Sequence, residues 1–211
     1  MTSPVDFNLY LITDRLNLPA GKDLFAQVEA ALRGGVRTVQ LREKDLSARE
    51  LLPLALQMRA LTKKYDAKLL INREIDVAIA VEADGVHLGG ECLTVVDARA
   101  RLGKERLIGI STHAIEEIRQ AQQDGADFVT FGPVYATPSK LKYGEPVGLD
   151  RLHAVVKEFG SVLPVFALGG VKRDRLPELL ACGCRRVACI GAILFAENAE
   201  SEARNILKSL E

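Results

Sequence analysis

One amide and two cations follow a short apolar segment at alternate positions. Gln40, Arg42 and Lys44 are separated by Leu41 and Glu43. Alternate side chains of an extended strand point to the same side, so these three polar groups would share one surface. Such a set indicates a binding site for an anion or a polar heterocycle. The simpler alternative is a solvated strand end.

Later apolar segments also end in polar residues. Asn72 offers both a hydrogen-bond donor and an acceptor, and Ser111 offers a hydroxyl. We interpret His87 as a hydrogen-bonded packing residue in preference to a ligand or base. His113 follows Ser111 by two positions. Histidine as a residue type suits proton transfer near neutral pH, so His113 is the candidate catalytic residue, and a purely structural role is the alternative.

Two features indicate phosphate binding. The hydroxyls of Thr137 and Ser139 and the ammonium of Lys140 lie within four positions, and all can donate to phosphate oxygens, although a surface turn would also explain them. Glycines occur at two places, Gly169 with Gly170 and Gly191 after Ile190, where the backbone N–H groups could approach a phosphate. These glycines follow the seventh and eighth apolar segments, and many barrels bind phosphate there.

Eight strand-like segments alternate with amphipathic segments. The predicted strands are residues 9–13, 38–41, 68–72, 85–88, 107–111, 128–131, 165–168 and 186–190. This alternation favours parallel pairing in an α/β fold, and we predict a single (β/α)8 TIM barrel over residues 1–211. A doubly wound open sheet is the alternative, but no GxGxxG turn follows the first segment.

Connections between the strands carry their own signals. Ser47 and Glu50 have the spacing of a capping box that opens the second helix, and Pro53 predicts a kink or a later start. Glycines between helical and strand segments predict left-handed helix ends; they are Gly35, Gly85, Gly125 and Gly183. Residues 132–147 are long for a barrel connection, so we expect an active-site loop there.

Composition limits the possible partners. The 211 residues carry 28 Lys and Arg against 28 Asp and Glu, so no charge surplus favours nucleic acid or an anionic membrane. No apolar segment reaches the roughly 18 residues of a membrane-spanning helix, and no secretory signal is visible. We therefore expect a cytoplasmic protein that binds a small molecule. A homodimer remains an open alternative.

These strings, in this order, resemble the thiamine phosphate synthase family. The most specific are residues 40–44, 83–89 and 131–140, and the likeness extends from 9 to 193. The resemblance implies a TIM barrel that joins an aminopyrimidine methyl diphosphate to a thiazole phosphate and releases pyrophosphate, with Mg²⁺.

The resemblance also implies roles for individual residues. Those matching the family's pyrimidine diphosphate site are Gln40, Arg42, Lys44 and Asn72. Those that further line this site are Ser111, Thr137, Ser139 and Lys140. Those matching the thiazole phosphate site are Gly169, Gly170, Ile190 and Gly191.

Two positions depart from the family pattern. Arg73 and Cys92 stand where the synthases carry their magnesium-binding aspartates, and only Glu91 is adjacent. Magnesium prefers hard oxygen ligands, which a guanidinium and a thiol do not provide. We therefore expect no metal, and we favour the related thiazole tautomerases, which use a histidine in the string matching His113 and aromatise a carboxythiazole phosphate without a cofactor. A synthase with Mg²⁺ is the alternative, and a non-catalytic thiazole or thiamine phosphate binder is the third. In each case the partner is a small phosphorylated molecule.

Overall fold

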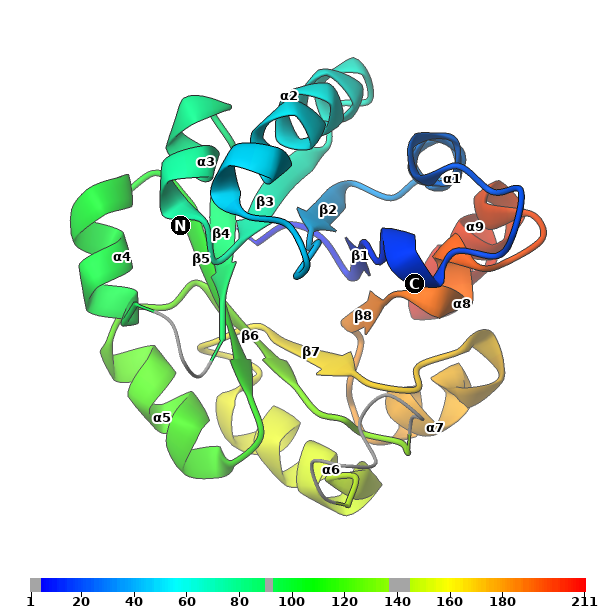
Figure 1. Cartoon of the computed structure of the whole chain (residues 1–211). Coiled ribbons are helices and arrows are strands. Elements are labelled where there is room, and N and C mark those ends of the chain that lie inside the picture. Colours follow the sequence, from blue (N-terminus) through cyan, green and yellow to red (C-terminus); the bar gives the residue numbers. More distant parts are fainter. Residues whose placement is uncertain (1–4, 90–92, 137–144) are drawn as a thin grey trace.

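Eight parallel strands close into a barrel, as predicted (Figure 1). The computed structural model describes residues 5–89, 93–136 and 145–211. Neighbours in the sequence are neighbours in the sheet, and β1 closes the ring against β8 with Tyr10 opposite Ala188. The strands are β1 Leu9–Ile12, β2 Thr38–Leu41, β3 Lys68–Asn72, β4 Gly85–Leu88, β5 Leu107–Thr112, β6 Phe128–Phe131, β7 Val165–Leu168 and β8 Val187–Cys189.

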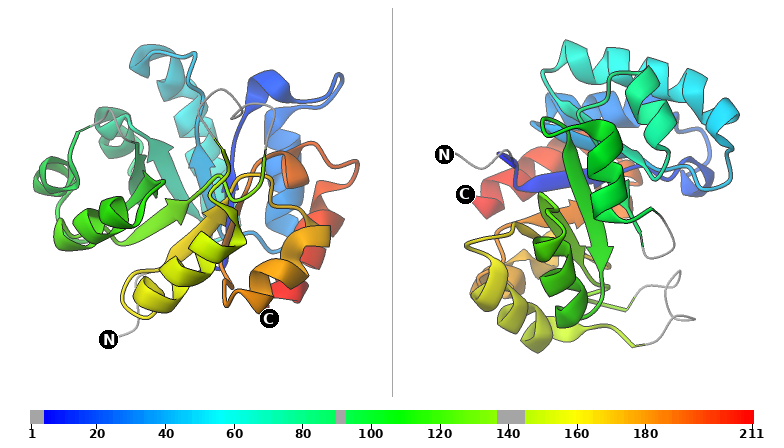
Figure 2. Two further views of the ribbon diagram at one scale, coloured as in Figure 1. Left: turned by 90° about the horizontal axis from the view of Figure 1, so that it is seen from below. Right: turned by 90° about the vertical axis from the view of Figure 1, so that its left-hand side faces the viewer.

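Helices surround the strands on the outside of the barrel (Figures 1 and 2). They are α1 Leu24–Arg33, α2 Ala48–Lys64, α3 Ile75–Ala80, α4 Val95–Leu102, α5 Ile115–Gln123, α6 Gly148–Phe159, α7 Leu176–Ala181, α8 Gly191–Leu194 and α9 Ala199–Leu210. Short 3-10 helices are η1 Arg15–Asn17 and η3 Arg173–Arg175. Within the described ranges, none of these helices combines the length and the apolar character that crossing a membrane requires.

Alternation along each strand divides the apolar residues into two cores. Leu9 and Leu11 of β1 face outward and belong to the large core beneath the helices. Tyr10 faces inward and packs with Phe128 and Phe166 in the barrel interior. Because aromatic rings fill the interior at this level, polar side chains are left to occupy the carboxyl end of the barrel, where the active sites of such folds lie.

The start of α2 differs from the expectation based on Pro53. The helix begins at Ala48, and both halves of the capping box between Ser47 and Glu50 are present. Pro53 lies inside the helix, beyond its first turn. The expected later start is therefore wrong, because the satisfied cap fixes the first turn even though proline removes one donor further along.

Three of the four glycine turns have the expected left-handed backbone. Positive φ angles of 107°, 84° and 80° are found at Gly35, Gly125 and Gly183. Gly85 instead lies within β4, where a Cβ atom would come within 2.1 Å of the carbonyl oxygen of Leu107. Glu82 takes the left-handed conformation of that turn, with φ of 51°. Gly85 therefore permits β4 to pack closely against β5, and it does not end a helix.

Candidate functional site at the carboxyl end of the barrel

A chain of polar side chains crosses the barrel interior. Nε2 of Gln40 lies 2.9 Å from the Tyr10 hydroxyl, which lies 3.4 Å from Nδ1 of His87. Nε2 of His87 lies 3.0 Å from the hydroxyl of Ser111, which lies 3.4 Å from that of Thr130. Five strands contribute, so residues far apart in the sequence form one network above the aromatic core.

The hydrogen bonds of this network can all be assigned in one direction, from Gln40 to Ser111. Because the Gln40 amide donates to the Tyr10 oxygen, the Tyr10 proton is free to point to Nδ1 of His87. Nε2 of His87 then donates to Ser111. Burial raises the pKa of Tyr10, and burial together with the charge of Arg42 lowers the pKa of His87 to about 3. The network is therefore neutral at physiological pH, and its Ser111 end can present a hydroxyl donor to a ligand.

A second network joins the ends of β1 and β2. The hydroxyl of Thr13 donates to Oε1 of Glu43 at 2.6 Å and accepts the backbone N–H of Arg42 at 2.8 Å. Oε2 of Glu43 accepts the backbone N–H of Arg15 at 3.1 Å. Burial raises the pKa of Glu43, against the effect of these donors. Glu43 thus acts as a support that holds the backbone of Arg42 at the barrel rim.

Cations gather at the rim beside this support. Arg42 follows β2 directly. Burial lowers its pKa, the charges of Asp14 and Glu43 oppose this effect, and the charge of Arg73 adds to it. Arg73 follows Asn72, the last residue of β3, which lies opposite His87 in the sheet. Lys44 is exposed in the turn that follows. Gln40 and Arg42 therefore approach the barrel mouth. Lys44 lies beyond the end of β2, so the alternation of the strand does not fix the direction of its side chain.

Glycines after β7 make close contact with the connection that follows β6. Gly169 and Gly170 have φ of 97° and 67°. A Cβ atom on Gly169 would lie 2.5 Å from Cα of Pro133, and one on Gly170 would lie 2.8 Å from Cβ of Tyr135. Arg175 donates to the carbonyl of Gly170 at 3.0 Å and covers the Tyr135 ring. Only glycine fits this turn, and the carbonyl of Gly169 accepts the backbone N–H of Tyr135 at 3.1 Å.

The short helix α8 begins at Gly191, immediately after β8. The first N–H groups of a helix have no partner within it, so those of α8 open toward the carboxyl end of the barrel and suit a phosphate. Gln27 of α1 donates to the carbonyl of Leu194 at 2.7 Å and anchors the far end of α8. Ile190, Gly191, Gly169 and Gly170 thus lie on two adjacent strand ends.

His113 lies at the rim after β5. Its Nδ1 is hydrogen-bonded to the carbonyl oxygen of Gly132, and its backbone N–H donates to Glu117 at 2.6 Å. Because a carbonyl only accepts, Nδ1 carries the proton in the neutral ring and Nε2 keeps its lone pair. His113 is exposed, and it could act as a base through Nε2 toward a ligand at the mouth.

Several predicted residues lie outside the described ranges. They are Thr137, Ser139, Lys140, Glu91 and Cys92, together with the central part of the expected loop at 132–147. Among residues 5–89, 93–136 and 145–211, no group of three His, Cys, Asp or Glu side chains could hold a metal ion. The acids nearest Arg42 are engaged, since Asp14 accepts from Asn17 and Glu43 accepts from Thr13. This part of the rim therefore does not fit magnesium.

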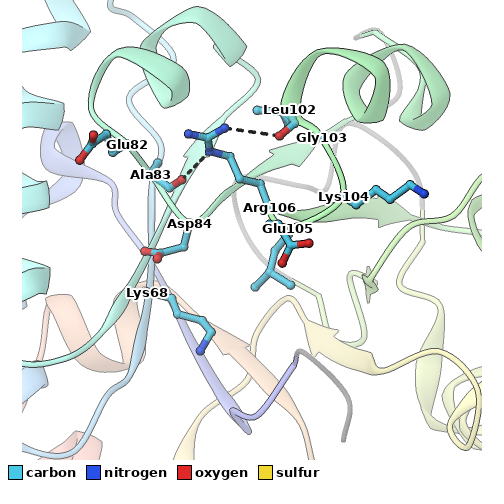
Figure 3. A pocket seen from close by; sticks show the side chains of 10 residues that line it. Lys68, Glu82, Ala83, Asp84, Leu102, Gly103, Lys104, Glu105 and Arg106 are labelled. Atoms are coloured by element: carbon cyan, nitrogen blue, oxygen red, sulfur yellow. Dashed lines mark hydrogen bonds between the residues drawn. The ribbon is translucent and has the colours of Figure 1, made fainter. Parts of the chain in front are cut away.

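An open depression of about 530 Å³ lies at the other end of the barrel, where β3, β4 and β5 begin (Figure 3). Arg106 donates there to the carbonyls of Ala83 and Leu102 at 3.2 and 3.4 Å. Lys68 pairs with Asp6 at 3.0 Å. Arg106 and Lys68 thus interact with groups of the protein itself. The amino end of such a barrel contributes to stability rather than to catalysis.

Residue types alone did not identify Tyr10, Thr130 or the role of Glu43. Tyr10 lies in an apolar strand, and its partners are 30 and 77 positions away in the sequence. The alternation of β1 and β6 was the available signal, because it places Tyr10 and Thr130 on inward faces. Burial of Glu43 follows from the same alternation, which puts it on the opposite side from Arg42.

Known proteins with similar sequences cover nearly the whole chain. A family model described as thiamine monophosphate synthase matches residues 9–193. A Geobacter sulfurreducens protein, provisionally named a thiamine-phosphate synthase, is 55% identical over 206 residues, which are 98% of this chain and 95% of that protein. The thiamine-phosphate synthase of Halalkalibacterium halodurans is 42% identical over 193 residues, covering 92% and 90% of the two chains. The thiamine phosphate pyrophosphorylase structure from Pyrococcus furiosus superposes with a TM-score of 0.85 at 33% identity, covering 96% and 95%.

Proposed function

Because this chain belongs to the thiamine monophosphate synthase family, we propose that it joins an aminopyrimidine methyl diphosphate to a thiazole phosphate and releases pyrophosphate. The sequence alone favours a thiazole tautomerase, with the synthase as the alternative. The names of the relatives support the synthase instead. The structural observation that carries the proposal is a neutral hydrogen-bonding network lying directly beneath a cationic rim.

The network suits a flat heterocycle with several nitrogen atoms. Gln40 has an amide oxygen left as an acceptor, Ser111 has a hydroxyl donor, and Asn72 has both. A neutral floor binds a neutral ring without the cost of burying an unpaired charge. The rim above it carries Arg42, whose planar guanidinium suits the oxygen atoms of a diphosphate.

The second substrate would bind on the opposite side of the mouth. The glycine turn at Gly169 and Gly170 packs closely against the connection after β6, and beside it the start of α8 at Gly191 offers N–H donors to a phosphate. The thiazole nitrogen would then approach the methylene carbon of the pyrimidine. Two phosphate sites on either side of a ring-binding floor match a reaction between two phosphorylated heterocycles.

A thiazole tautomerase is the second candidate, and two observations favour it. Arg73 occupies the position of a family magnesium-binding aspartate, and Nε2 of His113 is available as a base. Tautomerisation moves protons and needs no metal. The network around Gln40 and Tyr10 is more elaborate than a thiazole alone requires, which is why we place the tautomerase second. A non-catalytic thiazole or thiamine phosphate binder would keep the phosphate sites and turn over neither substrate.

One assay separates these possibilities. The purified full chain is offered the two synthase substrates in one mixture and the carboxythiazole phosphate in another, each with and without magnesium. We expect thiamine phosphate and pyrophosphate in the first mixture. A Gln40→Leu variant serves as the site control, and its rate should fall at least tenfold because the ring loses its amide partner. Aromatisation without condensation would establish the tautomerase, and ligand binding without either product would establish the binder.

A further inference from the structure

Arg73 has an unusual backbone conformation for its place in the fold. It follows β3 directly, and its φ is 67°. Among the described residues, the other non-glycine positions with positive φ are Asp66 and Glu82, which lie where helices α2 and α3 have ended. Left-handed backbone is rare for a long side chain, and such strain concentrates at functional sites. The N–H of Arg73 donates to the carbonyl of His87 at 3.0 Å, which holds this conformation between β3 and β4.

Arg73 lies near Arg42 at the rim. Strands β2 and β3 are parallel neighbours, with Leu41 opposite Ile71, so the residues that follow them emerge at the same edge. The positive charge of Arg73 acts on Arg42 and contributes to its lowered pKa, after the larger effect of burial. The charges of Asp14 and Glu43 oppose this effect on Arg42. Two guanidiniums close together at a partly buried rim gain further when an anion binds between them.

We propose that Arg73 and Arg42 together clamp the diphosphate of the pyrimidine substrate directly, with Arg73 providing the positive charge that a metal ion would otherwise provide. This inference rests on the proposed synthase function. A guanidinium can give two parallel hydrogen bonds to phosphate oxygens, and it keeps its charge at any physiological pH. A divalent cation would be repelled by both groups.

The clamp would act on the leaving group of the condensation. The bond between the methylene carbon and the diphosphate oxygen breaks, and its electron pair leaves with pyrophosphate. The lone pair of the thiazole nitrogen forms the new carbon–nitrogen bond, so the product ring becomes a cation and no proton is transferred. Negative charge grows on the bridging oxygen as it departs, and a fixed guanidinium stabilises that charge in the transition state.

Inorganic pyrophosphate is the direct probe of this clamp. Binding to the full chain is measured by titration calorimetry, once with EDTA and once with magnesium chloride. We expect wild-type protein to bind pyrophosphate in EDTA, and added magnesium should not strengthen the affinity. The proposal is overturned if binding is seen only when magnesium is present.

Variants test whether Arg73 itself is responsible. Arg73→Asn removes the cation and keeps a residue type that tolerates left-handed backbone, and Arg73→Gly is a second variant with full backbone freedom. Each should weaken pyrophosphate binding in EDTA at least tenfold, with thermal unfolding as the check on folding. Arg101→Asn is the matched control, since Arg101 pairs with Asp76 on the outer helices and should leave binding unchanged. Wild-type affinity in a folded Arg73 variant would refute the clamp.

Turnover measured in parallel keeps this inference separate from the function on which it rests. If thiamine phosphate forms but pyrophosphate binding does not depend on Arg73, the clamp is wrong and the synthase assignment stands. If pyrophosphate binding depends on Arg73 but no thiamine phosphate forms, the clamp stands and the synthase assignment is wrong.

Discussion

Nε2 of His87 lies 3.0 Å from the hydroxyl of Ser111, while Nδ1 of the same ring faces the hydroxyl of Tyr10 at 3.4 Å. Both ring nitrogens are therefore engaged within the barrel, and the side chain is almost fully buried. His87 is a connector between two polar residues rather than a group poised to exchange protons with solvent. Its lowered pKa, about 3, is a consequence of burial first and of the charge of Arg42 second.

This burial predicts a specific dependence of stability on pH. Above pH 6.5, His87 is neutral in both the folded and the unfolded chain and has no effect on the dependence. Between pH 6.5 and about 3, the unfolded chain binds a proton at His87 that the native chain does not, so stability falls as pH falls. In that window His87 should lower the free energy of unfolding by up to about 1.4 kcal/mol per pH unit.

Urea unfolding between pH 7.5 and 5 measures this effect. The raised pKa of Glu43 acts with the opposite sign above pH 4.5, within this range, but it is common to the wild type and the variants, so the comparison is between their slopes. His87→Asn should be less stable at pH 7.5 but should lose much of the slope below pH 6.5. His153→Asn, at an exposed position on α6, is the control and should keep the slope. Equal slopes in wild type and His87→Asn would show that His87 titrates normally.

Tyr10 is the centre of the same network, and its hydroxyl can be removed without changing the ring. Tyr10→Phe leaves the buried amide of Gln40 and Nδ1 of His87 without their partner, which should cost about 1–3 kcal/mol of unfolding free energy. Tyr65→Phe is the matched control, because the Tyr65 hydroxyl donates to Glu29 near the surface and its loss should cost less. Chemical unfolding of both variants gives the comparison. A Tyr10→Phe protein as stable as Tyr65→Phe would mean that water replaces the hydroxyl.

The barrel could be predicted because its signals are local. Each strand is a short β-branched segment, and β2, β3, β4, β6 and β7 have the predicted limits. The limits of β1, β5 and β8 differ, and β5 ends at Thr112, one residue later than predicted. Thr13 was expected in β1, but its hydroxyl binds Glu43 and supports Arg42 just beyond the strand. Strand β8 is Val187–Cys189 and is shorter than the predicted 186–190.

The site could be predicted only in part, for a physical reason. Arg42 and Asn72 were identified because their residue types are unusual at strand ends. Tyr10 was not, since its role depends on contacts across the barrel and its residue type is common in apolar strands. The left-handed conformation of Arg73 likewise depends on a bond to the neighbouring strand, which no local pattern predicts.

Gly109 makes room for an aromatic ring inside the barrel. A Cβ atom at this position would lie 2.3 Å from Cζ of Phe128, and that ring packs against Phe7 and Phe166 and cannot withdraw. Gly109→Ala should therefore destabilise the protein by about 1–3 kcal/mol through overpacking. Phe128→Leu in the same chain should recover part of this loss, and the double-mutant cycle over the four proteins measures the coupling. If the losses of stability in Gly109→Ala and Phe128→Leu are additive, the contact between these two residues is not the cause of the destabilisation.

Substitution of His113 should affect carboxythiazole aromatisation and condensation differently. Its hydrogen bond to the Gly132 carbonyl keeps the proton on Nδ1, so Nε2 can take a proton from a substrate. His113→Ala should lower any carboxythiazole aromatisation by about 10²–10⁴-fold, the usual cost of losing a general base. Condensation transfers no proton, so its rate should stay within a few-fold, and His153→Ala should alter neither reaction. A large loss of condensation in His113→Ala would show instead that the histidine contacts the synthase substrates or orders the connection after β6 through Gly132.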